Sequence, residues 1–505
     1  MPRPNSTFSY NLGNLKMSSR QFKFNRIYPT SIPHPTSILD TSDSSPDYNT
    51  NARLGYYKTL WPSEMTDLYR SHCVLNGGLP VDPSNLQITT SNNLAAPAFG
   101  YTRKKNEIYI LGGSVAFLGS FINGIVNETA VCQDNIIIDY IPYVSKFNYD
   151  LSSHIVTNID YGKTVNYIGG LLIHENGFIY AVARSVVYKL DPDTLQIINY
   201  TNLPLANSTG EIVYSVNASS YLTIYNGMQV SKNGRLILKG FTRTEAGPIY
   251  GVMVQVDPDT LQLLVVNAMT NGTSARLTIY TDASKNQYIS TINTTDIIRY
   301  LITDDAFTLD NSYTAQYRTS DSTTSTIGSS TLIFDKINRL SFSNNNNCGP
   351  LTGIQIYNYP VDTSGSIISK NAFSPSLPGV NFFMIASDNI INQYVICYDP
   401  INKSISCNKL YSNGNFEFIW QQNNLTISAC IAIVVNKNHI YIDDYVNGYD
   451  YFVILSLSTG IELARIKTQA TLPTIGGIFP GMNNDVYLVS NQIGDTTGYV
   501  TRIFM

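Results

Sequence analysis

The stretch VVYKLDPDTLQII, residues 186–198, decides the fold, because it returns 66 residues later as VMVQVDPDTLQLL, residues 252–264. A third version, LPVDPSNLQITT, occupies residues 79–90, ahead of the first regular repeat. In each copy an apolar segment runs into an Asp-Pro turn, where Asp accepts backbone hydrogen bonds and Pro fixes the next backbone angle. A further strand-like segment follows. The phrase therefore predicts the closing hairpin of a repeated β unit.

A second phrase, an Asn followed by a short strand of Tyr, Ile, Leu and Val, marks the opening hairpin of each unit. Eight copies are present, 43 to 70 residues apart, at Asn106, Asn176, Asn233, Asn286, Asn338, Asn381, Asn438 and Asn484. Because Asn tolerates left-handed backbone angles, we expect positive φ at Asn176 and Asn233, each of which precedes a Gly. Small residues that open the preceding strand fit an innermost position. Four strands per unit, without helical periodicity, are typical of a β-propeller.

We therefore predict an all-β chain in which residues 79–505 form a single β-propeller of eight four-stranded blades. The predicted blades are residues 93–157, 161–202, 221–268, 274–319, 325–373, 377–412, 426–468 and 473–505. Seven blades are the alternative, because Pro375 and Pro378 interrupt the innermost strand expected in the sixth unit, and Pro cannot donate a ladder hydrogen bond. The insertion at residues 114–135 is expected to project from one face.

The last unit ends at Met505 after its third strand, and the Asp-Pro turn and the outer strand are missing. The early copy of the phrase, residues 81–91, supplies that strand. We expect an N-terminal outer strand to close the ring, which removes two exposed sheet edges at once. The residues expected at this closure are Leu86, Ile88, Val500 and Ile503.

Residues 1–78 are rich in Pro, Ser, Thr and Tyr, lack an amphipathic period, and are predicted to form an extended arm. The arm carries six apolar anchors without an obvious partner: Phe22, Phe24, Ile27, Tyr28, Leu60 and Trp61. We expect these anchors to pack on a neighbouring copy of the protein; the alternative is the outer wall of the same propeller. Removal of residues 1–60 is expected to leave the ring stable, whereas removal of residues 1–90 is not.

Residues that could carry chemistry are scattered. The five histidines show no ligand spacing, and we expect His174 and His439 to be solvated loop residues. Asp191, Asp193, Asp257 and Asp259 could hold calcium at the two Asp-Pro turns, but turn capping explains them better, because calcium takes six or more oxygens. The sequence provides no catalytic residues and no cofactor site that we can name. The six cysteines are expected to be free thiols, including Cys397 and Cys407.

The phrase YKLDPDTL, residues 188–195, resembles the blades of quinoprotein-like and YVTN-type propellers, and IYILGG, residues 108–113, is loosely similar to a Kelch strand. The resemblance covers residues 81–505 and implies architecture alone. It transfers no catalytic residue, because a shared fold does not determine function.

Only 13% of the residues are charged and the net charge is −4, so no basic surface for nucleic acid is expected. No apolar run is long enough to insert in a membrane, and the first residues lack the apolar core of a signal peptide. We expect a non-catalytic structural or adhesive protein that self-associates into an oligomer or filament on an extracellular or virion surface; a cytoplasmic location is the alternative. Nine sequons allow glycosylation, although chance supplies as many. The alternative function is an enzyme, or a binder of small molecules or glycans, at the channel mouth.

Overall fold

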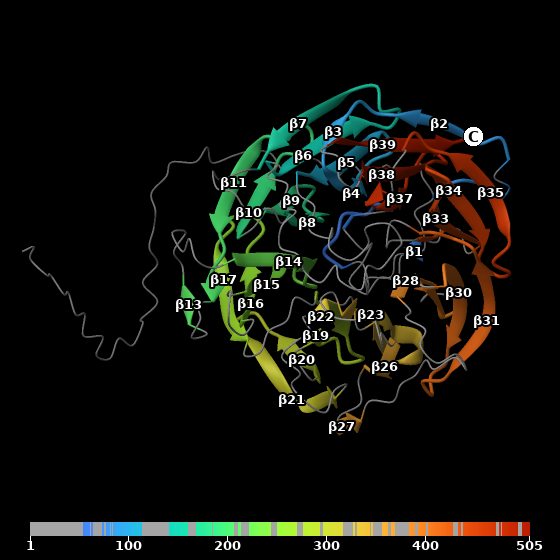
Figure 1. Cartoon of the computed structure of the whole chain (residues 1–505). Coiled ribbons are helices and arrows are strands. Elements are labelled where there is room, and N and C mark those ends of the chain that lie inside the picture. The colour runs from blue at the N-terminus through green and yellow to red at the C-terminus, as the bar shows by residue number, and fades with distance from the viewer. Residues whose placement is uncertain are drawn as a thin grey trace, which may run out of the picture.

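The computed structural model describes residues 54–113, 141–159, 168–206, 211–213, 222–243, 250–269, 276–316, 327–346, 356–368, 383–427 and 433–505, apart from short internal gaps. Eight antiparallel sheets radiate from a common centre in these residues (Figure 1). The chain is therefore an all-β propeller with eight blades. One 3-10 turn, Asp335–Ile337, is the sole helical element in the described residues. None of their helices could span a membrane.

Six of the eight blades have four strands of their own that follow the chain from the innermost to the outermost position. Blade 1 comprises β4 (Pro97–Thr102), β5 (Glu107–Gly112), β6 (Tyr143–Asn148) and β7 (His154–Asn158). Blade 2 comprises β8 (Ile168–Ile173), β9 (Ile179–Ala183), β10 (Val186–Leu190) and β11 (Ile197–Asn202). Blade 3 comprises β14 (Leu222–Val230), β15 (Leu236–Arg243), β16 (Tyr250–Val256) and β17 (Leu263–Met269). Blade 4 comprises β18 (Thr278–Thr281), β19 (Gln287–Ile292), β20 (Asp296–Ile302) and β21 (Phe307–Gln316).

The second half of the ring is less regular. Blade 5 comprises β23 (Thr331–Phe334), β24 (Arg339–Ser343) and β26 (Ile356–Pro360); the next strand, β27 (Gly365–Ile368), pairs in parallel with β21 of blade 4. Blade 6 comprises β28 (Phe383–Asp388), β29 (Tyr394–Asp399), β30 (Ser404–Leu410) and β31 (Phe416–Asn423). Blade 7 comprises β32 (Ile433–Val435), β33 (His439–Val446), β34 (Tyr449–Ser456) and β35 (Glu462–Lys467).

Blade 8 combines the two ends of the described chain. Its inner strand is split into β36 (Thr474–Ile475) and β37 (Ile478–Pro480), which both pair with β38 (Val486–Gln492), and β39 (Thr497–Phe504) follows. The outermost strand is β2 (Gln87–Thr90), which lies antiparallel to β39 with Ile88 opposite Ile503. Ser91 continues the contact, because its backbone N–H donates to the carbonyl of Val500 at 2.9 Å. Ile503 and Val500 are fully buried, and Leu86 and Ile88 pack against the same apolar cluster.

Blade 6 differs from the predicted register. The segment after Asn381 was expected to be a second strand, but β28 is the innermost strand of its sheet and contacts β32, the inner strand of blade 7. The predicted turn residue, Asn381, and both prolines lie outside the described residues. The register of β29 and β30 agrees with the prediction for the cysteines. Cys397 lies opposite Ser406, Cys407 lies opposite Ile396, and both thiols are free.

The opening hairpins use a different turn from the one expected. At residues 174–177 and 231–234, the positive φ belongs to Gly177 (86°) and Gly234 (73°), so the prediction for Asn176 and Asn233 is wrong. In both turns the N–H of the Gly donates to the carbonyl three residues earlier, at 2.8 and 2.9 Å. This is a type I turn followed by a left-handed residue, a common three-residue hairpin connection in which Gly carries the strain. Positive φ does occur at Asn338 (54°) and Asn484 (55°).

Replacement of Gly234 by Ala is expected to destabilise the protein by about 1–2 kcal/mol, because an L side chain would be held at φ 73°. Its Cβ would also lie 3.0 Å from Glu175 Oε1. Gly227→Ala is the matched control in the same blade, because its nearest neighbour would be 3.6 Å away. Urea unfolding should show the larger loss for Gly234→Ala, and equal losses would contradict the assignment of strain to this turn.

Candidate functional site at the centre of the ring

The Asp-Pro turns join neighbouring blades, which explains why their sequence is repeated. Asp191 Oδ1 accepts hydrogen bonds from the backbone N–H groups of Asp193 and Thr194, at 2.9 and 2.8 Å, and Asp257 caps its own turn in the same way. Asp193 and Asp259 are free to point toward the preceding blade. There Asp193 Oδ1 lies 3.2 Å from Arg103 Nη1.

A similar contact occurs at four successive blade interfaces. At each, a side chain on the third strand of one blade bonds to the last turn of the next blade. The donor and acceptor pairs are Lys146 Nζ with Asp193 Oδ1 (3.4 Å), Lys189 Nζ with the Asp259 carbonyl (3.2 Å), Gln255 Nε2 with the Thr303 carbonyl (2.7 Å) and Arg299 Nη1 with the Val361 carbonyl (2.7 Å). Two second-strand tyrosines, Tyr109 and Tyr180, reinforce the first two joints by donating to the carbonyls of Pro192 and Pro258. Asp191 and Asp257 therefore cap turns, and Asp193 and Asp259 form contacts between blades.

In the described part of the chain, no three His, Cys, Asp or Glu side chains are grouped closely enough to hold a metal ion. The two histidines expected in solvent are buried instead. His174 is 3% exposed and its Nε2 lies 2.7 Å from the carbonyl of Gly234 in blade 3; His439 is 1% exposed and is the first residue of β33. Burial is the main cause that lowers the pKa of His174. The expectation of solvated loop histidines was wrong, because His174 contacts blade 3 and His439 lies in a strand.

The described residues 54–60, 62–63, 73–74 and 77–79, which we call the threading segment, lie against the inner strands. Tyr57 N–H donates to the Ile173 carbonyl at 3.0 Å, and Ile173 N–H donates to the Pro62 carbonyl at 2.8 Å. The segment thereby extends the inner edge of blade 2. In Figure 1 it is the blue trace near the centre of the ring.

The threading segment also contacts four other blades. Tyr56 donates from its hydroxyl to Gln229 of blade 3, and Thr59 Oγ1 lies 3.2 Å from Thr102 Oγ1 of blade 1. Farther along, β1 (Cys73–Val74) pairs in parallel with β32 of blade 7. Gly78 N–H then donates to the Gly481 carbonyl of blade 8 at 3.3 Å. One short segment therefore ties five consecutive blades together.

Most of these contacts lie on the face where the first and second strands of the blades are joined, which we call the turn face. Thr59, His174 and Gly481 all lie at this face, next to the opening turns of blades 1, 2 and 8. The threading segment therefore covers part of the turn face near the inner strands.

The predicted arm is thus in part a component of the ring. Leu60, expected to anchor a neighbouring copy, is 4% exposed, and its side chain fills the space where a Cβ on Gly77 would be. That prediction was wrong for Leu60, because the side chain is covered by its own chain. The other anchors, Phe22, Phe24, Ile27, Tyr28 and Trp61, lie outside the described residues, as does the insertion at 114–135.

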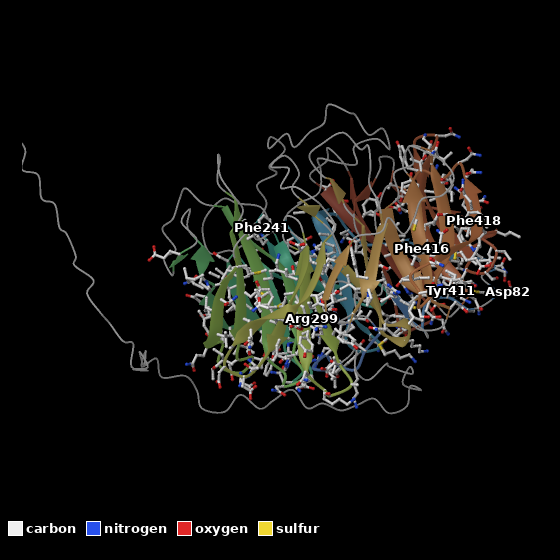
Figure 2. All side chains as sticks on the ribbon, turned by 90° about the horizontal axis from the view of Figure 1, so that it is seen from below. Asp82, Phe241, Arg299, Tyr411, Phe416 and Phe418 are labelled. Atoms are coloured by element: carbon white, nitrogen blue, oxygen red, sulfur yellow. The ribbon has the colours of Figure 1, made fainter. Side chains whose placement is uncertain are left out.

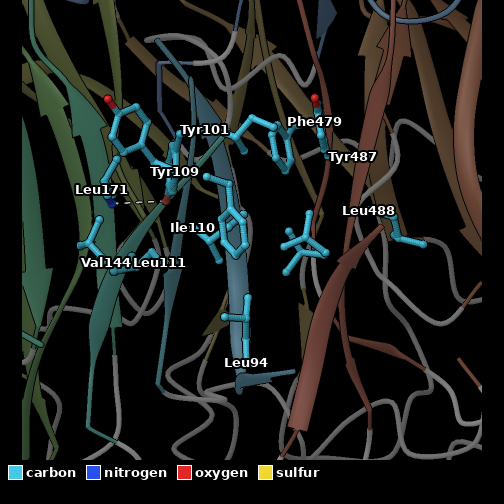
Figure 3. Close-up of a cluster of buried hydrophobic side chains, with 14 of the residues drawn as sticks. Leu94, Tyr101, Tyr109, Ile110, Leu111, Val144, Leu171, Phe479, Tyr487 and Leu488 are labelled. Carbon is cyan, nitrogen blue, oxygen red and sulfur yellow. Dashed lines mark hydrogen bonds between the residues drawn. The ribbon is translucent and has the colours of Figure 1, made fainter. Parts of the chain in front are cut away.

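The inner strands pack closely where blades 8, 1 and 2 meet (Figure 3). A Cβ on Gly100 of β4 would overlap the ring of Phe479, which stacks on Tyr487 with ring centroids 5.2 Å apart. The hydroxyl of Tyr101 accepts a hydrogen bond from the Leu171 N–H at 3.3 Å. Side chains therefore fill the space between these blades.

Two ionisable side chains of the blades are fully buried. Lys239 of β15 is fully buried, and burial lowers its pKa to about 7. Asp450 of β34 is also fully buried, and its pKa is raised well above the usual value, by burial first and then by the negative charge of Asp443. The sequence analysis singled out neither residue.

No protein-family model matches the chain, and no curated protein matches its sequence. Solved structures match in fold at 9–10% identity. They include the quinohemoprotein alcohol dehydrogenase of Comamonas testosteroni (90% of this chain and 81% of that one, TM-score 0.54) and a europium-containing methanol dehydrogenase (88% and 97%, TM-score 0.51). A third is the quinohemoprotein alcohol dehydrogenase ADHIIG of Pseudomonas putida HK5 (88% and 80%, TM-score 0.54). The chain is a β-propeller similar in fold to quinoprotein alcohol dehydrogenases.

The threading segment occupies the inner edges of blades 2 and 7. Likeness at this identity shows the fold alone, and the chemistry of those enzymes is not transferred.

Proposed function

We propose that this propeller is a structural building block whose outer wall binds further copies of the same chain. The observation that carries the proposal is the exposure of large apolar side chains on outer strands, which a single copy leaves in contact with water. Between 37% and 62% of each of the following side chains is exposed: Ile155, Val156, Ile197, Tyr200, Leu264, Leu309, Phe418 and Leu463 on the outer strands, and Ile461 beside β35. Apolar side chains mark a protein–protein contact surface where they gather into one patch.

The backbone of the outer wall favours the same use. Strands β7, β11, β17, β31 and β35 each end their sheet, so each presents one edge without a strand partner in the described structure. An exposed edge strand with apolar side chains is a template for pairing with another chain. A charged fraction of 13% leaves few charges to oppose such pairing.

The largest exposures cluster near the joint between blades 6 and 7. Phe418 of β31 is 60% exposed, and Ile461, just before β35, is 62% exposed. The two regions are in contact, because Trp420 Nε1 donates to the Leu457 carbonyl at 2.8 Å and its ring covers Gly460. We call Phe418, Ile461 and the nearby Leu463 the rim patch. Figure 2 shows Phe418 on the outer wall of the ring, near Phe416 and Tyr411.

Replacement of Phe418 and Ile461 by Ser is expected to raise the concentration needed for self-association by about tenfold or more, because each buried side chain contributes roughly 1.5–3 kcal/mol. Light scattering after size-exclusion chromatography measures this. Tyr200→Ser, on the outer strand of blade 2, is the control for general loss of surface apolarity. A wild-type protein that stays monomeric at high concentration would refute the proposal.

Further parts of the proposal concern the arm and the location. Residues 1–53, with Phe22, Phe24, Ile27 and Tyr28, would bind a neighbouring copy, and the assembly would lie on an extracellular or virion surface. Low charge and the apolar outer wall support both the binding by the arm and this location. Glycans are a further candidate partner. An enzyme or binder at the channel mouth is the second candidate, because the structures that match in fold include alcohol and methanol dehydrogenases.

A further inference from the structure

Blade 5 lacks an outermost strand in the described part of the chain. Its sheet runs from β23 through β24 to β26, so its third strand is also its last. The next strand along the chain, β27, begins at Gly365, soon after β26 ends at Pro360, yet it pairs in parallel with β21 of blade 4. The segment that supplies the fourth strand in the six regular blades therefore does not supply it in blade 5. We call the side of β26 away from β24 the blade 5 edge.

The end of β26 is fixed against blade 4. The Pro360 carbonyl accepts a hydrogen bond from the Tyr313 hydroxyl at 2.8 Å, and the Val361 carbonyl accepts one from Arg299 Nη1 at 2.7 Å. Tyr359 and Val361 are each 1% exposed and belong to the apolar cluster that extends through blades 2 to 4. The blade 5 edge is therefore presented by a strand that its neighbours hold in place. A fixed strand edge is a template for an added strand, because its outward backbone groups can pair with another chain.

The N-terminal part of the chain already adds strands to two other blades. In blade 8, β2 supplies the outermost strand, and in blade 7, β1 pairs in parallel with the inner strand β32. Residues 1–53 precede these segments, and the first described residue, Leu54, lies beside Gly55, whose carbonyl accepts a hydrogen bond from Glu175 N–H at the turn face. Fully extended, 53 residues span about 170 Å, which is enough to reach from one copy to the next.

One short stretch of the arm has the sequence pattern of an outer strand. In QFKFNRIY, residues 21–28, the aromatic residues Phe22, Phe24 and Tyr28 are spaced by even numbers, so a strand would carry all three on one side. Pro29 follows and would end the pairing, because Pro has no N–H to donate. Two outer strands of this chain read similarly, since FKF corresponds to the FEF that opens β31 and NRI to the ARI within β35.

We propose that residues 21–28 of one copy bind the blade 5 edge of a neighbouring copy as its fourth strand. This inference rests on the proposed self-association, and it names the segment and the edge through which the arm binds. Backbone hydrogen bonds to β26 would supply affinity, and the aromatic side of the added strand would bury apolar area. Each copy has one arm and one blade 5 edge at different places, so the contact is head-to-tail and joins copies into a ring or a filament.

The first test mixes two full-length variants, Asn25→Cys in the arm and Asn358→Cys at the centre of β26, under mild oxidation. We expect a disulfide between the two copies, identified by mass spectrometry of the linked peptides; Lys23→Cys and Ile27→Cys cover the neighbouring registers. Asn267→Cys on β17, the last strand of blade 3, is the matched control. It should give about tenfold less product, because a disulfide needs Cα atoms within about 7 Å.

Two results of this test would overturn the proposal. Equal yields at Asn358 and Asn267, or no product in any register, would mean that the arm does not select the blade 5 edge. A disulfide that forms only within single chains of the double variant Asn25→Cys/Asn358→Cys would mean that the arm binds its own copy.

The second test uses light scattering of full-length Asn25→Pro, which removes a backbone donor from the proposed strand and leaves the ring unchanged. The concentration needed for self-association is expected to rise about tenfold, whereas Asn14→Pro, outside the strand, should have no effect. If wild type and Asn25→Pro associate equally, this inference is wrong while the proposed function stands. A wild-type protein that stays monomeric refutes the proposed function, and this inference with it.

Discussion

Deletion of residues 1–79 is expected to lower the melting temperature by about 10 °C or more, whereas deletion of residues 1–53 should change it by roughly 2 °C or less. The difference arises from the threading segment. Its side chains Tyr56, Leu60 and Leu79 are 3%, 4% and 0% exposed, and full burial of each contributes roughly 1.5–3 kcal/mol. Both shortened chains retain β2, so the closing strand is the same in each. Thermal unfolding followed by circular dichroism measures the effect.

The deletion series also tests the contacts at residues 54–60. Residues 1–60 were expected from the sequence to be dispensable, but the contacts of Gly55, Tyr56 and Thr59 with blades 1, 2 and 3 argue against that expectation. A third chain, lacking residues 1–60, should therefore fall between the other two. If it melts with the chain lacking residues 1–53, the contacts at residues 54–60 do not stabilise the ring.

The regular blades could be predicted because their turns carry distinctive residues. In DPDT, Asp caps the turn and Pro fixes its angle, so the hairpin is visible without any knowledge of distant contacts. The early copy of that phrase also predicted an N-terminal outer strand, and the structure pairs β2 with β39. The sequence did not reveal the second role of the turn. Asp193 and Asp259 bond to a preceding blade, and such contacts depend on three-dimensional proximity.

The threading segment could not be predicted, because it is bound through contacts with other segments and has no period of its own. Several of its hydrogen bonds are made by backbone groups, such as those of Tyr57 and Gly78, which any residue provides. Blade 6 was placed out of register because a strand flanked by Pro fits an outer as well as an inner position.

The burial of two aspartates in blade 7 could not be predicted from the sequence. The aspartates of DDYVNGYDY, residues 443–451, suggest a charged hairpin end, which is normally solvated. In the structure Asp443 and Asp450 are nevertheless fully buried, because burial depends on how distant segments pack.

Arg103→Met is expected to destabilise the propeller by about 2 kcal/mol, because the buried Arg103 loses its charge-assisted hydrogen bonds to Glu107, which is 14% exposed, and to Asp193, which is 58% exposed. The Arg103 side chain is 1% exposed, and its Nη1 lies 3.1 Å from Glu107 Oε2 and 3.2 Å from Asp193 Oδ1. Its guanidinium also lies over the ring of Tyr57, 5.5 Å from the centroid. One side chain therefore joins blade 1, the Asp-Pro turn of blade 2 and the threading segment. Met keeps much of the apolar volume, so the loss reports on charge more than on packing.

Lys189→Met is the matched control, because Lys189 makes the corresponding joint between blades 2 and 3 and forms an ion pair with one carboxylate, that of Asp259. Its Nζ lies 3.6 Å from Asp259 Oδ1, and the Asp259 side chain is 61% exposed, so this pair should contribute about 1 kcal/mol or less. Urea unfolding of both variants, and of each with its Asp changed to Asn, gives the coupling energies. Arg103 should couple to Asp193 by about 1 kcal/mol, and the Lys189 pair by less. Equal losses of unfolding free energy for the two single variants would contradict this prediction. They would mean that Arg103 stabilises one blade joint, as Lys189 does, and that its contact with Tyr57 does not connect the threading segment to the ring.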